Sequence, residues 1–308
     1  MSSNDIDSLF AYIGILLGKK LIMRNLSELL LEREDTPSPS PALSWPLESD
    51  CHLHVVDGAN PPLEPGALSV CFADCLLKQP GLYKGDKLID IYKDFIKDHG
   101  KDIRKGRIVL LATGLDADSI KGLWNAFPKG MFRGIGELKC YDKYGTVKEI
   151  EVPYKKIQWV RDLCKFSGER CGCAPIYLHY TLNHPSYVKR LRRLLEDFPG
   201  IPIVLCHCGL SRRDQENTIY DMDWTFSQVR DLARDHGNLW LDVSHDAGDY
   251  VTWTPGRLES LPRDRVLLGS DCSPIASAMG AEGGWRWAPE AAKIIPYSQN
   301  LKKLFGLE

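Results

Sequence analysis

The sequence shows no strong bias in charge or composition. Its 39 Lys and Arg residues nearly balance 41 Asp and Glu residues, which leaves a formal net charge of −2. Proteins that coat nucleic acids or membrane surfaces normally carry a basic excess, so we expect neither as a partner. With 44% hydrophobic and 26% charged residues, the composition is that of a folded globular protein. A small-molecule partner is therefore the starting expectation.

Long apolar segments are also missing. The apolar run at residues 9–17 ends before Lys19 and Lys20, and it is much shorter than the roughly 20 residues that cross a bilayer. Asp5 and Asp7 stand where a secretory or mitochondrial signal would be basic. The sequence therefore predicts a cytoplasmic protein without a membrane span.

Residues 1–49 differ from the rest of the chain. Apolar residues recur at roughly helical spacing over residues 6–17 and 21–31. The Pro- and Ser-rich segment 36–41 follows, and no helix can cross it intact. We predict a helical extension and linker at 1–49, followed by one domain at 50–308. The extension is expected to pack on this domain or on a second subunit of a homo-oligomer, with a membrane-surface helix as the alternative.

Eight short apolar runs, rich in β-branched residues, follow residue 50. They cover residues 51–56, 68–73, 107–112, 134–139, 175–179, 203–207, 239–243 and 266–271. Amphipathic, charged segments separate most of them, for example residues 88–99 and 187–197. Strands with little internal alternation that are joined by helices predict a parallel sheet covered on both faces.

The number of these units favours a (β/α)8 TIM barrel in the α/β class. Only 11 residues separate the first two runs, which leaves little room for a helix between them. A doubly wound open sheet is the alternative architecture, but no Gly-rich phosphate loop follows any of the runs.

Histidine and aspartate gather at the predicted carboxyl ends of the strands. The first run contains His52 and His54, the fifth ends in His179, the sixth in His207 and the eighth in Asp271. Residues two apart on a strand point to the same side, and barrel enzymes keep their chemistry at this rim. Imidazole and carboxylate together suit Zn²⁺, Mn²⁺ or Fe²⁺. The pattern predicts a divalent-metal site, with hydrogen-bonded core histidines as the alternative.

Four motifs resemble the amidohydrolase superfamily. They are Asp50-Cys-His-Leu-His54, Ile203-Val-Leu-Cys-His-Cys-Gly209, Leu239-Trp-Leu-Asp-Val-Ser244 and Arg265-Val-Leu-Leu-Gly-Ser-Asp271. They are most similar to the amidohydrolase-2 branch, which includes aminocarboxymuconate-semialdehyde decarboxylase and dicarboxylate lactonases. Over residues 50–308 the resemblance implies a metal-dependent barrel enzyme. It implies His52, His54, His179 and Asp271 as ligands, and His207 as a second-metal ligand or a hydrogen-bond donor in the transition state.

The fourth strand decides the number of metal ions. In binuclear relatives this strand carries a bridging ligand, which is either a Glu or a carboxylated Lys. Gly136-Glu137 looks like the Gly-Glu of metal-dependent deoxyribonucleases in the same superfamily. We expect Glu137 to be the bridge and Lys139 to bind substrate or to serve as a structural cation. A carboxylated Lys139 and a site with a single ion are the alternatives.

The resemblance implies a hydrolase with one or two Zn²⁺ ions, or with Mn²⁺ or Fe²⁺, that cleaves an amide, ester or lactone bond of a small anionic substrate. Asp271 would accept a proton from the attacking water, and His207 would stabilise the developing oxyanion. Arg212 and Arg213 are expected to bind a carboxylate or phosphate of the substrate. A non-oxidative decarboxylase, a metal-dependent nuclease or phosphoesterase, and an inactive barrel that serves as an interaction module are the alternatives.

The ten cysteines include no Cys-x-x-Cys pair, which favours free thiols over a disulfide framework. Cys51, Cys206, Cys208 and Cys272 lie next to candidate ligands in the sequence. Strand alternation predicts that the first three point outward toward the helices, so we assign them no role in metal binding or catalysis.

Overall fold

The structure is a computed structural model that describes residues 49–55, 63, 67–73, 86–114, 116–140, 153–182, 184–209, 222–244, 255–270 and 293–308. Eight parallel strands form a sheet whose spatial order follows the chain from β1 to β8. The strands are β1 (Ser49–Val55), β2 (Leu68–Ala73), β3 (Ile108–Ala112), β4 (Phe132–Lys139), β5 (Ile176–His179), β6 (Ile203–Leu205), β7 (Leu239–Ser244) and β8 (Val266–Gly269).

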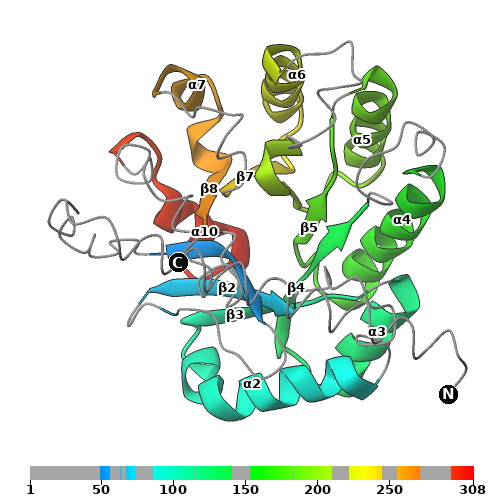
Figure 1. Cartoon of the computed structure of the whole chain (residues 1–308), viewed down its shortest axis with the longest axis vertical. Helices are drawn as coiled ribbons and strands as arrows, with labels where there is room; N and C mark the ends of the chain where they lie inside the picture. Colours follow the sequence, from blue (N-terminus) through cyan, green and yellow to red (C-terminus); the bar gives the residue numbers. More distant parts are fainter. Residues whose placement is uncertain are drawn as a thin grey trace, which may run out of the picture. The chain divides into compact units, whose positions relative to one another are not determined.

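Helices follow most of the strands and lie around them (Figure 1). The described α-helices are α2 (Asp86–Arg104), α3 (Ala117–Ala126), α4 (Pro153–Arg170), α5 (Pro185–Asp197), α6 (Met222–Asp235), α7 (Pro255–Glu259) and α10 (Tyr297–Phe305). Short 3-10 segments are η2 (Cys206–Gly209) and η4 (Arg263–Arg265). Within the described ranges, no helix is both long and apolar enough to cross a bilayer.

The sheet turns back on itself, so that its first and last strands meet. The backbone N–H of Ser270, just after β8, donates to the Asp50 carboxylate on β1 at 3.0 Å. The Ser270 hydroxyl donates to the backbone carbonyl of His52 at 3.3 Å. A doubly wound sheet would reverse its strand order and leave two separate edges. The observed order and this contact confirm the predicted (β/α)8 barrel.

Each of the eight runs predicted from the sequence coincides with one strand. The larger differences are at the ends: β1 begins two residues earlier, at Ser49, and β4 two residues earlier, at Phe132, while β6 ends at Leu205 and β8 at Gly269. The extension predicted at residues 1–49 lies, apart from Ser49, outside the described residues. Its helices, the homo-oligomer and the cytoplasmic location stay predictions.

The barrel has two apolar layers. Side chains inside the ring of strands form one cluster with residues of α10, which include Leu304 and Phe305. Phe305 lies close to Gly134 near the start of β4, so α10 covers the amino-terminal end of the barrel interior. The other cluster lies between the outer strand face and the helices. A filled interior leaves the carboxyl ends of the strands as the place for a functional site.

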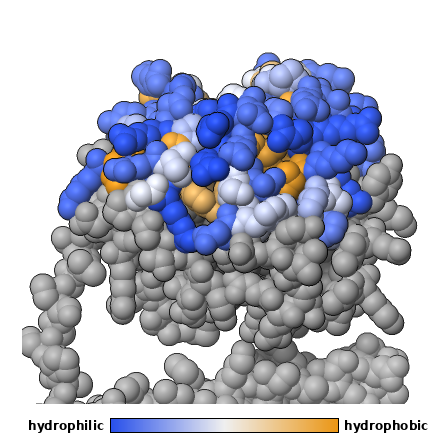
Figure 2. Space-filling model, turned by 90° about the horizontal axis from the view of Figure 1, so that it is seen from above, coloured by the Kyte–Doolittle hydropathy of each residue, from blue (hydrophilic) through white to orange (hydrophobic). Residues whose placement is uncertain are grey.

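The covering helices show their inner faces in the sequence. On α5, Val188, Leu191 and Leu194 recur at helical spacing and are buried. His184 caps this helix, because its Nδ1 accepts the backbone N–H of Ser186 at 3.1 Å. On the face seen in Figure 2, the described residues form a mostly hydrophilic surface in which hydrophobic residues occur as small separate areas.

Candidate metal centre

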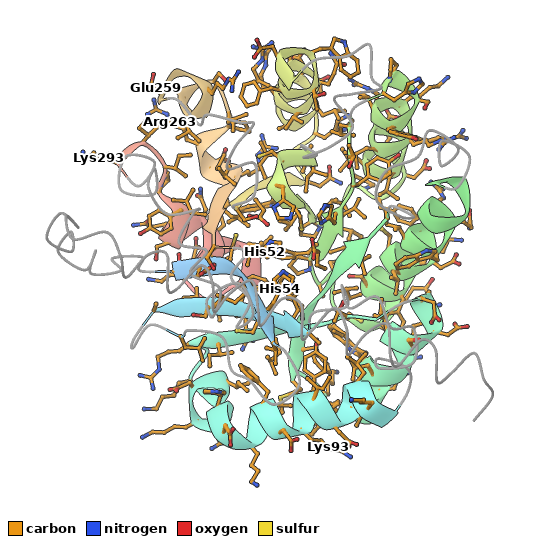
Figure 3. All side chains as sticks on the ribbon, in the orientation of Figure 1. His52, His54, Lys93, Glu259, Arg263 and Lys293 are labelled. Carbon is orange, nitrogen blue, oxygen red and sulfur yellow. The ribbon has the colours of Figure 1, made fainter. Side chains whose placement is uncertain are left out.

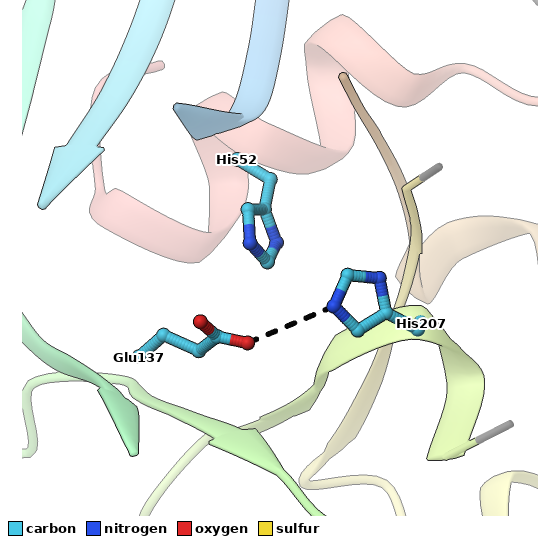
Figure 4. A group of neighbouring side chains, drawn as sticks. All are labelled: His52, Glu137 and His207. Carbon is cyan, nitrogen blue, oxygen red and sulfur yellow. Dashed lines mark ion pairs between the residues drawn. The ribbon is translucent and has the colours of Figure 1, made fainter. Parts of the chain in front are cut away.

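Three buried side chains converge at the carboxyl ends of the strands. His52 comes from β1, Glu137 from β4 and His207 from the η2 segment that follows β6. One ligand atom of each lies within 4.8 Å of the others. The three residues are only 0%, 3% and 7% exposed. Figure 4 shows them pointing toward one another, and Figure 3 places His52 and His54 inside the ring of strands.

The Glu137 carboxylate is the centre of this group. Its Oε1 lies 2.5 Å from Nδ1 of His179 and 3.6 Å from Nε2 of His207. The rings of His179 and His207 are in edge contact, with centroids 4.7 Å apart. The Thr113 hydroxyl donates to the backbone carbonyl of Glu137 at 3.1 Å and so helps to fix β4. A buried carboxylate among imidazoles is a donor set that can hold a divalent cation.

Gly136 is required where it stands. Its φ of +130° is a conformation that residues with a Cβ rarely adopt. A Cβ added here would lie 2.5 Å from the carbonyl oxygen of Tyr177 on the neighbouring strand. Glycine therefore lets β4 approach β5 closely at the residue before Glu137.

His207 reaches the centre because the backbone leaves the strand conformation. Along β6, Val204 faces the barrel interior and Leu205 faces the helices, so simple alternation would turn Cys206 inward and His207 outward. His207 and Cys208 instead adopt left-handed conformations, with φ of 53° and 52°. Such conformations cost about 1–2 kcal/mol in residues other than glycine and are concentrated at functional sites.

The predicted outward direction is wrong for Cys206 and Cys51. For Cys206, that prediction took His207 as an inward-facing residue of a regular strand, which would turn Cys206 outward. Cys206 lies in the interior cluster, and only Cys208 joins the helix layer as predicted. In β1 the pairing register with β2 shifts between Asp50 and Leu53. This irregularity lets both Cys51 and His52 face inward, and the Cys51 thiol donates to Asp242 Oδ1 at 3.3 Å.

Asp242 and Ser244 on β7 are site residues that the sequence interpretation did not assign. Asp242 Oδ2 lies 2.5 Å from Nδ1 of His52, and both side chains are fully buried. The Ser244 hydroxyl lies 2.9 Å from Nδ1 of His207. The available signal was two polar residues two positions apart in a strand whose other residues, Leu239, Trp240, Leu241 and Val243, are apolar.

Asp50 is a further buried acid beside the centre. Its Oδ1 accepts the backbone N–H groups of His52 and Ser270, each at 3.0 Å. Burial raises the pKa of Asp50 to about 6, although these hydrogen bonds oppose the rise. The carboxylate holds together the irregular part of β1 and the end of β8.

His54 and His179 border the central group. The His54 ring is 5.1 Å from that of His52 and 5.0 Å from that of Phe72, and the residue is 2% exposed. The side chain of His179 is 21% exposed, so it is the most open of the five candidate ligands that the structure describes. The structure thus brings His52, His54, Glu137, His179 and His207 to one end of the barrel.

Four predicted site residues lie wholly or partly outside the part of the chain that the structure describes. Asp271, Arg212 and Arg213 lie outside the described residues. Lys139 is the last residue of β4, and its side chain is also outside the described part. Their roles stay predictions.

A second group, formed by His52, Cys206 and Asp242, also has ligand atoms within 4.8 Å of one another. Burial raises the pKa of the Cys206 thiol well above its ordinary value. Because metals bind the thiolate form, this shift favours a protonated thiol at this place. The group therefore fits a hydrogen-bonded support beneath the centre better than a metal site.

Comparison with known proteins agrees with the resemblance seen in the motifs. The amidohydrolase family model matches residues 174–307, which extend from just before β5 into the end of the chain. The resemblance is thus confirmed for this part of the barrel. A search of curated protein sequences gives no match.

A search of solved structures finds similar proteins at low sequence identity. One is an amidohydrolase from Burkholderia multivorans with bound zinc, at 13% identity and a TM-score of 0.49, covering 85% of this chain and 100% of that one. Another is dihydroorotase from Campylobacter jejuni, at 16% identity and a TM-score of 0.42, covering 84% of this chain and 83% of that one. A third is 5-carboxyvanillate decarboxylase from Sphingomonas paucimobilis, at 13% and 0.40, covering 78% and 79%.

Proposed function

We propose that the protein is a metal-dependent hydrolase that cleaves an amide, ester or lactone bond of a small anionic substrate with activated water. The observation that carries this proposal is the convergence of His52, Glu137 and His207 within 4.8 Å at the carboxyl ends of the strands. The amidohydrolase family match over residues 174–307 supports it, because this range includes His179, His207 and Asp271.

The donor chemistry fits a divalent metal ion. The proposed ligands are imidazoles and carboxylates, the set that Zn²⁺ and similar ions prefer. They are His52, His54, Glu137, His179 and Asp271, together with His207 if two ions bind. When bound, such an ion lowers the pKa of a water ligand and polarises a substrate carbonyl.

The chain supplies the remaining functions in this proposal. Asp271 accepts the proton of the attacking water and passes it to the leaving group. His207, whose Nδ1 contacts the Ser244 hydroxyl, donates a hydrogen bond to the developing oxyanion. Lys139, Arg212 and Arg213 bind the anionic part of the substrate.

The first experiment combines elemental analysis with activity. The purified protein should contain about one to two divalent transition metals per chain, the number that this donor set can hold, and chelation should abolish turnover. A screen of esters, lactones, amides, phosphodiesters and aromatic carboxylic acids identifies the reaction. Release of CO₂ without hydrolysis would replace the proposed reaction with decarboxylation. An active, metal-free protein would refute the proposal.

Variants connect activity to the proposed residues. Asp271→Asn keeps an oxygen for the metal but removes the base, so turnover should fall by about 100-fold or more while metal is retained. Glu259→Gln is the control, because Glu259 is exposed on α7 and lies far out in the helical layer in Figure 3. Full activity in Asp271→Asn would contradict the assigned role.

A further inference from the structure

Two side chains of strand β7 contact two histidines of the candidate metal centre, each at the ring nitrogen Nδ1. Trp240, Asp242 and Ser244 alternate with the apolar residues that face the helices, so all three point into the barrel. Asp242 contacts Nδ1 of His52 and Ser244 contacts Nδ1 of His207. Both contacts involve the same ring nitrogen, Nδ1, and on His207 the other nitrogen, Nε2, lies 3.6 Å from Glu137 Oε1 in the centre.

The two carboxylate oxygens of Asp242 have different partners. Oδ2 lies 2.5 Å from Nδ1 of His52, and Oδ1 accepts the Cys51 thiol at 3.3 Å. The Cys51 thiol is the donor in the second contact, and Cys51 is itself fully buried. Asp242 is 0% exposed and therefore forms these contacts without competition from bulk water.

We propose that Asp242 is a positioning residue that fixes His52 in the tautomer with the proton on Nδ1 and directs Nε2 toward a divalent metal ion. The 2.5 Å contact requires one hydrogen between Oδ2 of Asp242 and Nδ1 of His52, and a carboxylate oxygen that accepts this hydrogen selects the Nδ1–H tautomer. A metal binds the nitrogen that carries no proton, which is then Nε2. This inference rests on the proposed metal-dependent function.

Ser244 differs from Asp242 in a way that matters at His207. A hydroxyl both donates and accepts hydrogen bonds, so Ser244 is compatible with a proton on either nitrogen of His207. Strand β7 therefore commits His52 to one tautomer and leaves His207 able to use both. This difference agrees with a fixed ligand role for His52 and a proton-donating role for His207.

The first test examines the tautomer in the metal-free protein. Nitrogen-15 NMR of protein labelled at histidine distinguishes protonated from unprotonated ring nitrogens, and a His52→Gln variant identifies the His52 signals among the eight histidines. The expected result is a proton on Nδ1 of His52 and none on Nε2. A proton on Nε2 in the unaltered protein would overturn the proposal, and this measurement does not depend on how any Asp242 variant folds.

The second test measures zinc affinity by competition with a chromophoric chelator. Asp242→Asn should weaken zinc binding about 10- to 100-fold, the usual effect of losing a carboxylate behind a histidine ligand. Asp242→Glu, which keeps the charge, should recover part of the affinity. Cys51→Ala is the matched control, because it removes the partner of the other Asp242 oxygen and should change the affinity less than about threefold.

The outcomes separate this proposal from the function on which it rests. If the unaltered protein binds no zinc, Mn²⁺ or Fe²⁺, the proposed function fails whatever the tautomer. If it binds metal and Asp242→Asn binds equally tightly, the metal centre stands and the role of Asp242 is refuted. Circular dichroism of the metal-free variants checks that the barrel has formed before affinities are compared.

Discussion

The Asp50 carboxylate accepts the backbone N–H of Ser270 at 3.0 Å and joins the first strand of the barrel to the end of the last. The same oxygen accepts the backbone N–H of His52 at 3.0 Å. One side chain therefore fixes the β1–β8 seam, the direction of a candidate ligand and the residue that precedes Asp271.

Asp50→Ala should destabilise the metal-free protein by about 2 kcal/mol or more, because two buried N–H groups lose their acceptor. Asp50→Asn keeps an oxygen acceptor without a buried charge, so its free energy of unfolding should fall by no more than about 1 kcal/mol. Urea unfolding at neutral pH compares the three proteins. Equal stability of the alanine and asparagine variants would show that these hydrogen bonds do not hold the seam.

A second prediction concerns the glycine that precedes Glu137. Gly136→Ala should lower the free energy of unfolding by more than about 2 kcal/mol, because the new Cβ meets Tyr177 at 2.5 Å and φ is +130°. Gly122→Ala is the control: Gly122 is exposed on α3, nothing lies within 4 Å of its added Cβ, and alanine should stabilise the helix by about 0.5–1 kcal/mol. In thermal unfolding, the melting temperature should therefore fall for Gly136→Ala and rise for Gly122→Ala. A tolerated alanine at position 136 would contradict the packing described for β4.

The strands could be predicted because each of them is a short apolar run that ends near a polar residue. The expected alternation is also seen on β4: Leu138 packs among the helices, while Glu137 lies in the buried central group. The role of Glu137 as a bridging ligand stays a prediction. The same reasoning predicted the strands that carry His52, His54 and His179.

The predicted directions of Cys51 and Cys206 were wrong because they were counted from His52 and His207 by alternation, and alternation holds only while the chain remains a regular strand. The register shift in β1 and the left-handed turn at His207 each interrupt it. Asp242 was missed because its role depends on a contact with His52, 190 positions earlier in the chain. Pairings at such separation arise from barrel closure, and no local pattern shows them.

A third prediction uses the ion pair at the end of α2. Arg107 Nε donates to the Asp102 carboxylate at 2.9 Å, and this hydrogen bond is the main reason that the pKa of Asp102 is lowered from 3.8. A lowered folded-state pKa stabilises the protein above 3.8, and this stabilisation is lost as the pH falls through the lowered value. At pH 7, Asp102→Asn should thus unfold at a lower urea concentration than the unaltered protein. The difference should be small because water reaches both side chains of the pair.

The difference between Asp102→Asn and the unaltered protein should disappear in acid. Urea midpoints measured from pH 7 down to pH 2 check this, with Asp98→Asn as a control for the loss of one exposed carboxylate on the same helix. A difference that persists unchanged at pH 2 would show that the amide acts through packing rather than through charge.

A fourth prediction orders the described thiols by reactivity. Cys173 is exposed, whereas Cys51, Cys71, Cys206 and Cys208 are buried, and burial raises the pKa of each of these four thiols well above 9.0. Because the thiolate is the reactive form, a brief pulse of iodoacetamide on the folded protein should label Cys173 first among the described cysteines. Peptide mass spectrometry measures the order. Labelling of Cys206 at the same rate would mean that the barrel interior opens readily.

The last prediction tests which residue of β4 holds the metal. Glu137 contacts His179 and His207, and Glu137→Gln removes its negative charge while keeping its size. Metal content should fall by at least one ion per chain in a two-metal protein, because a neutral amide is a poorer bridge between cations. Lys139→Ala should keep the full metal content and raise KM if Lys139 binds the substrate. Elemental analysis with steady-state kinetics separates these effects.

The opposite pattern, with metal lost from Lys139→Ala and kept in Glu137→Gln, would identify a carboxylated Lys139 as the bridge. Bicarbonate added during metal loading should then increase the metal content of the unaltered protein, whereas a Glu137 bridge predicts no change.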